Sequence, residues 1–173
     1  MPDQPVPARN SVGSPVGSPG GSPAGSLASR PGFLIRRLHQ IHVALFLEEC
    51  GAFEVTPVQY SIMSAVQANP GLDQASLGEE VGVDRATLAN VAGRLESRGL
   101  VQRRASPTDR RLRLVWMTDG GADVLARMEP AARRAHDRTI AALPGPERRA
   151  FTQALAQLVQ VGNGHGRAPL RLG

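Results

Sequence analysis

The chain has 173 residues, of which 41% are hydrophobic and 20% charged, as expected for one soluble globular domain. Aromatic residues make up only 3%, so the core must consist of Leu, Val and Ala, which favours helices. The chain has no apolar run long enough for a membrane span and no apolar segment of a secretion signal, and its single cysteine, Cys50, cannot form an internal disulfide. We therefore expect a cytoplasmic protein without a membrane partner.

The basic residues are all arginine, and they are unevenly distributed. Twenty basic residues stand against 15 acidic ones, a net charge of +5. Residues 44–80 hold six acidic residues and no Arg, whereas residues 81–113 hold eight Arg and three acidic residues. Such a basic segment is typical of a nucleic-acid-binding surface, with a solvated basic face as the alternative.

Residues 1–31 differ in composition from the rest of the chain. A four-residue repeat of Gly, Ser and Pro runs through them, beginning with Val12-Gly13-Ser14-Pro15. Segments of this kind bury too little apolar surface to offset the entropy lost on ordering, so we expect a disordered tail. Residues 162–173 are similar and are also expected to be a disordered tail, which leaves 32–161 as the predicted folded domain.

The first predicted helix begins near Phe33 and carries apolar residues on two adjacent stripes. The stripes consist of Leu34, Leu38, Ile41 and Leu45, and of Ile35, His39, His42 and Phe46. An apolar arc this wide suits an oligomer interface. Thr56-Pro57 is then expected to begin a second helix, which Asn69-Pro70-Gly71 ends.

Residues 76–99 predict two helices joined by a tight turn. Ser76 and Glu79 have the spacing of a capping box, and Gly82 suits a left-handed turn. Asp84 is expected to cap the second of these helices. The inner face of that helix is then formed by Leu88, Val91, Ala92 and Leu95. Together these features predict a helix-turn-helix.

The remaining pattern predicts a small sheet and two further helices. Residues 100–104 and 112–117 alternate as strands around a polar loop, and a hairpin after a helix-turn-helix makes a winged helix. A long helix is expected from about Ala122 to Leu143, kinked near residues 126–130 by Pro130, and a last helix over 147–161. The outer helices leave apolar faces that the winged-helix core cannot cover. We predict a mainly α fold with a small β-wing and N- and C-terminal dimerisation helices.

Three segments resemble the MarR (multiple antibiotic resistance regulator) family, and the resemblance extends over about 33–161. They are residues 83–101, 106–111 and 114–121, which hold the predicted recognition helix, the Asp-Arg-Arg wing and the start of the long helix. The chain departs from the family in its tail and in Met117, where Leu is usual. The resemblance implies a homodimeric, cytoplasmic repressor or, less often, activator that binds a pseudo-palindromic operator and is released by a small ligand. The DNA-binding core would then be about 56–118.

The second helix of the helix-turn-helix is expected to face the major groove. With its inner face buried, helical geometry turns outward Arg85, Ala86, Ala89, Asn90 and Arg94. Arg85 and Asn90 can make paired hydrogen bonds to guanine and adenine edges, and Thr87 can donate to a phosphate. Arg94 has three open interpretations: base reading, a phosphate contact, or a salt bridge to Glu96 or Asp84.

The wing supplies the other predicted DNA contacts. Asp109 is expected to pair with Arg110, Arg111 or Arg113 and so to hold the loop rigid. By resemblance, Arg111 is expected to enter the minor groove and Arg110 to contact phosphate. On the preceding strand, Arg103 and Arg104 are weaker candidates, one for phosphate and one for solvent.

His39 and His42 lie three residues apart on the first predicted helix. They can serve ordinary packing, an effector pocket or a metal site, although no third metal ligand is linked to them by spacing. The resemblance favours a pocket for aromatic carboxylates or phenolics, lined by His39, His42, Phe46, Tyr60 and Met63. We predict no metal and no cofactor. Oxidant sensing by Cys50 is disfavoured because Glu48 and Glu49 oppose formation of the thiolate.

No phosphate-binding loop, nucleophile elbow or metal-ligand cluster is present, so the sequence does not indicate an enzyme. It predicts a sequence-specific, DNA-binding transcriptional regulator, a homodimeric repressor released by a small aromatic or phenolic acid. Two alternatives remain open: a winged-helix module that binds another protein, and an architectural DNA-binding module without an effector.

Overall fold

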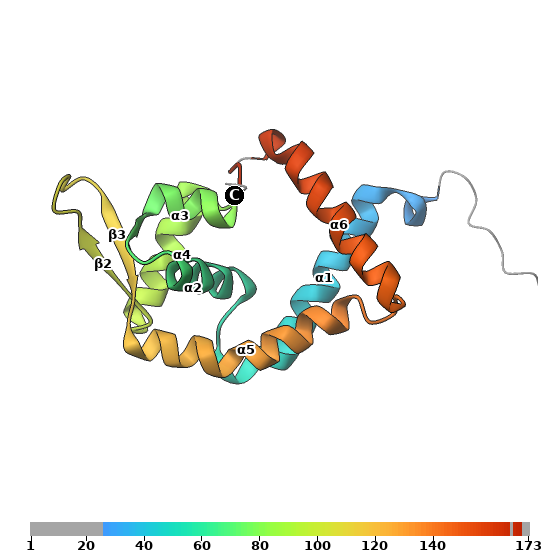
Figure 1. Ribbon diagram of the computed structural model, residues 1–173, viewed down its shortest axis with the longest axis horizontal. Helices are drawn as coiled ribbons and strands as arrows, with labels where there is room; N and C mark the ends of the chain where they lie inside the picture. The colour runs from blue at the N-terminus through green and yellow to red at the C-terminus, as the bar shows by residue number, and fades with distance from the viewer. Residues whose placement is uncertain (1–25, 167, 171–173) are drawn as a thin grey trace, which may run out of the picture. The chain divides into compact units, whose positions relative to one another are not determined.

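The computed structural model describes residues 26–166 and 168–170 (Figure 1). The chain divides into two units between Arg36 and Arg37. In the first, Leu27–Ser29 form a short 3-10 helix, and Pro31 begins the helix α1, Pro31–Cys50. The predicted disordered tail of residues 1–31 lies mostly outside the described residues and stays a prediction.

The second unit is mainly helical, with a three-stranded antiparallel sheet, which confirms the predicted fold class. After α1 come α2 (Pro57–Ala68), α3 (Gln74–Val81) and α4 (Arg85–Ser97), then the hairpin β2 (Val101–Ala105) and β3 (Arg113–Met117). The helices α5 (Asp119–Thr139) and α6 (Gly145–Gly162) complete the order, followed by a short 3-10 helix, Asn163–His165. None of the helices in the described part of the chain has the length and apolar content needed to cross a bilayer.

The sheet contains one strand that the sequence pattern did not predict. β1 consists of only Leu72–Asp73, and it pairs with β3 opposite Val115 and Leu114, giving the order β1-β3-β2. Two residues are too few to show an alternating pattern, which explains the omission. β1 anchors the start of α3 to the sheet and thereby fixes the helix-turn-helix against the wing.

Side-chain caps define where four of the α-helices begin, and two of these caps, Thr56 and Asp84, are the predicted ones. Thr56, Asp84 and Thr118 each accept a hydrogen bond from a backbone amide of the following helix. The predicted capping box of Ser76 is wrong: Asp73 caps α3, and the Ser76 hydroxyl donates to Asp73. Gly82 ends α3 in the left-handed conformation, as expected.

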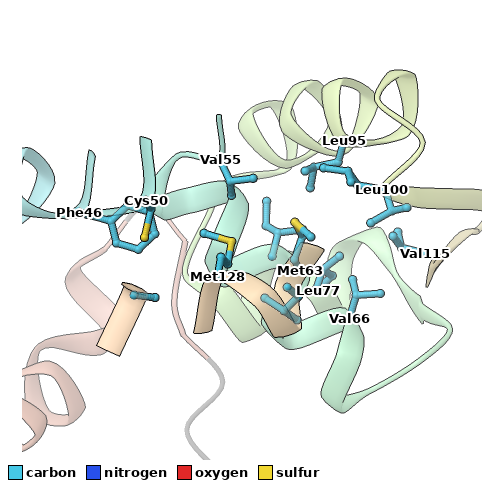
Figure 2. Packing of buried hydrophobic residues seen from close by; sticks show 14 of the residues in the cluster. Phe46, Cys50, Val55, Met63, Val66, Leu77, Leu95, Leu100, Val115 and Met128 are labelled. Atoms are coloured by element: carbon cyan, nitrogen blue, oxygen red, sulfur yellow. The ribbon is translucent and has the colours of Figure 1, made fainter. Parts of the chain in front are cut away.

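The core joins all helices of the winged helix to the sheet and to α5. Figure 2 shows its side chains, which include Met63 and Val66 of α2, Leu77 of α3 and Leu95 of α4. Cys50 is also buried there, and burial raises the pKa of its thiol, with Glu49 adding to the effect. The buried residues fix α4, so the side chains on its opposite face have a defined direction.

Ion pairs join α5 to the end of α1. Arg138 contacts Glu48 and Glu49, and Arg134 contacts Glu49 at 2.8 Å. Pro130 lies inside α5, which continues past it from Asp119 to Thr139, and the expected kink at this proline stays a prediction. By contrast, α6 buries none of its side chains.

Candidate functional site

The outer face of α4 is exposed, as the helical pattern predicts. Leu88, Ala92 and Leu95 are fully buried, and Val91 is half-buried beside them. The opposite face exposes the predicted DNA-facing residues Arg85, Ala86, Thr87, Ala89, Asn90 and Arg94. The described residues offer Arg94 no ion pair: Asp84 bonds to the start of its own helix, and Glu96 binds another arginine.

The start of α4 is less available to a phosphate than the sequence indicated. Asp84 accepts hydrogen bonds from the backbone amides of Ala86 and Thr87, at 3.1 and 3.0 Å. The Thr87 hydroxyl donates to the same carboxylate at 2.7 Å, so its hydrogen is not free for a phosphate. These bonds hold the pKa of Asp84 below its usual value. We conclude that the Thr87 hydroxyl orients the carboxylate of Asp84, which caps α4.

Arg103 ties the wing to α4. Its Nε and one terminal nitrogen donate to Oε2 of Glu96 at 2.8 and 2.5 Å, and its backbone amide donates to Oε1 at 2.9 Å. Three bonds to one carboxylate lower the pKa of Glu96 and fix the angle between helix and strand. Arg103 was predicted to contact phosphate or solvent. In the structure its guanidinium binds Glu96 and holds β2 against α4.

The wing loop is ordered through its backbone. Asp109 accepts from the amide of Arg111 at 2.9 Å, and no arginine side chain among the described residues pairs with it. The expected pairing of Asp109 with a guanidinium is therefore wrong, although the carboxylate does shape the loop. The guanidinium groups of Arg110, Arg111 and Arg113 are on exposed residues, without an ion pair to the described residues.

A pocket of about 550 Å³ lies between α1, α2, α3 and α5. The rings of His42, Phe46, Tyr60 and His136 line it. Two of the predicted ligand residues do not line this pocket: His39 is exposed on α1, and Met63 points from α2 into the core. His136 was missed because 94 residues of sequence separate it from His42, and only the packing of α5 on α1 brings their rings to 5.0 Å.

Hydrogen bonds define the polar character of this pocket. The Thr139 hydroxyl donates its hydrogen to the Ala135 carbonyl at 2.8 Å, so in its 2.9 Å bond with His42 it accepts from Nδ1–H. The Nε2 of neutral His42 then remains an acceptor. The Tyr60 hydroxyl donates to Glu129 at 2.7 Å, and burial together with this bond raises the pKa of Tyr60 to about 12.

The stability of the protein is expected to fall on acidification because of His42. Burial lowers the pKa of His42 from 6.5, and His136 and His39 lower it further. Since the unfolded chain takes up the proton first, this contribution to stability is present above pH 6.5 and is lost as the pH falls through the lowered pKa.

Urea titrations at pH 7 and pH 5 measure this effect. His42→Gln should reduce the loss of stability between the two pH values. His165→Gln, which removes an exposed histidine outside the pocket, serves as the control. Identical losses in wild type and His42→Gln would contradict the assignment.

The helix-turn-helix, the antiparallel hairpin and the exposed arginines define a winged-helix protein of the DNA-binding type. A model of the MarR family matches residues 53–112. The transcriptional regulator HosA of Escherichia coli O111:H- is 34% identical over 125 residues, which are 72% of this chain and 91% of HosA. The chain therefore belongs to the MarR family, whose matched relatives are transcriptional regulators.

Two solved structures show what similar proteins bind. The PcaV transcriptional regulator of Streptomyces coelicolor, solved with its natural ligand, is 36% identical and has a TM-score of 0.72. The match covers 80% of this chain and 98% of PcaV. The transcriptional repressor CouR, solved on a 23-mer DNA duplex, is 32% identical with a TM-score of 0.73. That match covers 78% of this chain and 96% of CouR.

Proposed function

We propose that this protein is a sequence-specific, homodimeric DNA-binding repressor that a small aromatic acid releases from its operator. The observation that carries the proposal is the exposed face of α4 beside the exposed arginines of the wing. Arg85 and Asn90 read base edges in the major groove, while Arg111 enters the minor groove and Arg110 contacts phosphate. The DNA complex of CouR supports this use of the fold.

Dimerisation is supported by the apolar side chains that the outer helices expose. On α1 they are Leu34, Ile35, Ile41 and Leu47, and on α6 they are Leu155, Leu158, Val159 and Val161. Because a monomer in water would leave these side chains exposed, a second copy is the simplest partner. A two-fold dimer also presents two recognition helices to a pseudo-palindromic site.

The pocket supports an aromatic ligand with a hydroxyl group. Its rings provide flat apolar surface, and the Nε2 of neutral His42 can accept a hydrogen bond from a phenol. The pocket touches α2 and α3, which carry the helix-turn-helix, so a ligand can change the distance between the two recognition helices of a dimer.

A fluorescence-anisotropy titration with the DNA upstream of the protein's own gene tests the proposal. We expect binding that resists scrambled competitor and weakens with salt, and a mass in solution of twice that of the chain. Binding lost equally to scrambled DNA would favour the architectural alternative. Absence of DNA binding, with capture of an acidic protein instead, would favour the protein-interaction alternative.

Replacing His42 by phenylalanine is expected to weaken release by a phenolic acid. The change keeps a ring but removes the acceptor, so about three- to tenfold more 4-hydroxybenzoic acid should be needed to dissociate the DNA. Benzoic acid, which lacks the hydroxyl, is the matched control and should act equally on both proteins. An equal loss for both acids would show that His42 contributes packing alone.

A further inference from the structure

The segment Ala168–Leu170, here called the C-terminal segment, is held by a pair of hydrogen bonds. The Asn163 side-chain amide donates to the Leu170 carbonyl, and the Leu170 amide donates to Asn163 Oδ1, both at 2.6 Å. One asparagine thus satisfies both backbone groups of Leu170, which defines where its side chain lies. The prediction that residues 162–173 are a disordered tail did not anticipate these contacts.

Leu170 packs on the end of α3 and lines the pocket. A β-carbon added at Gly82 would lie 3.5 Å from Leu170 Cδ1, so the leucine covers the turn that ends α3. In the pocket wall it accompanies Glu80 and Val81 of α3, whereas the aromatic rings belong to α1, α2 and α5. Leu170 therefore forms a part of the pocket wall that does not belong to α1, α2, α3 or α5.

We propose that Leu170, positioned by Asn163, is a specificity-determining residue of the pocket and limits the size of the ligand. The proposal rests on the ligand-binding function proposed above. The other apolar walls are side chains of helices that the core fixes, so their positions are costly to change. Among the described residues, Leu170 is held by the two bonds to Asn163 and packs at the end of α3, outside the buried core, so the size of its side chain can vary without disturbing the core.

Two acids with the same functional groups and different size test the proposal. The probes are 4-hydroxybenzoic acid, with one ring, and 6-hydroxy-2-naphthoic acid, with two, each titrated by calorimetry. Leu170→Ala should shift the ratio of the two affinities toward the two-ring acid by about tenfold, and Leu170→Trp should shift it the opposite way. Leu112→Ala, which shortens an exposed leucine of the wing, should keep the wild-type ratio.

A second variant tests the role of Asn163. Asn163→Ala removes both bonds to Leu170 and should shift the ratio in the same direction as Leu170→Ala; a wild-type ratio would overturn the positioning role. If the wild type binds the one-ring acid and all Leu170 variants share its ratio, this inference fails and the proposed function stands. If wild type and variants bind neither acid, the proposed ligand function fails, and this inference fails with it.

Discussion

Replacing Gly121 by alanine is expected to destabilise the protein by about 3 kcal/mol or more. Gly121 is buried in the first turn of α5, and a β-carbon there would lie 1.9 Å from the Leu100 carbonyl oxygen. That carbonyl cannot easily move, because it accepts from the amide of Thr118 and shares the Thr118 hydroxyl with the carbonyl of Gly99. The new methyl group would therefore separate α5 from the start of the wing.

Gly120 offers a matched control one residue away. A β-carbon at Gly120 would find no atom closer than 3.9 Å, and the residue is exposed. Gly120→Ala should therefore be neutral or stabilise the protein by up to about 1 kcal/mol, because alanine favours a helix. Urea unfolding of the three proteins at equal concentration measures both changes, and equal midpoints would contradict the steric argument.

Local patterns predicted the parts of the fold that depend on neighbours in sequence. The caps Thr56 and Asp84 and the buried stripe of α4 follow from short-range rules, and the structure confirms them. The start of α3 lies one turn earlier than predicted, because Asp73 accepts from the amides of Ala75 and Ser76. Asp73 caps this helix because pairing with β3 places it one turn earlier than the predicted Ser76.

The parts of the site that sequence reasoning missed depend on distant contacts. His136 reaches the pocket because α5 packs on α1, and Leu170 reaches it because Asn163 turns the chain back toward α3. From the sequence, Arg103 is a candidate for a DNA contact. Its side chain instead binds Glu96, and this contact depends on how β2 packs against α4, which the sequence pattern does not give. Charge alone marked the basic segment but did not show which arginines are free.

Replacing Arg111 by alanine is expected to weaken operator binding by about ten- to a hundredfold. Arg111 is exposed in the wing, and its amide is bound to Asp109. The backbone of the loop is thus ordered before DNA arrives, so little entropy is lost when the guanidinium enters a groove. In the proposed dimer, which has two wings, one substitution removes two contacts.

Anisotropy titrations on two operators separate a minor-groove role from a phosphate contact. In one operator the base pairs that flank the half-sites are A·T, which narrow the minor groove, and in the other they are G·C. If Arg111 enters the minor groove, Arg111→Ala should cost more affinity on the A·T operator than on the G·C operator. Equal losses, with a smaller salt slope, would instead assign it to phosphate.

Arg127→Ala controls for the loss of positive charge, because Arg127 is exposed on α5 and pairs with Asp123 at 3.3 Å. The two variants carry the same net charge, so any long-range electrostatic effect on DNA is similar in both. Only a group that touches the duplex should then lower affinity in a way that depends on the flanking base pairs. If Arg127→Ala weakens binding as much as Arg111→Ala, the wing contributes only general charge, and recognition depends on α4 alone.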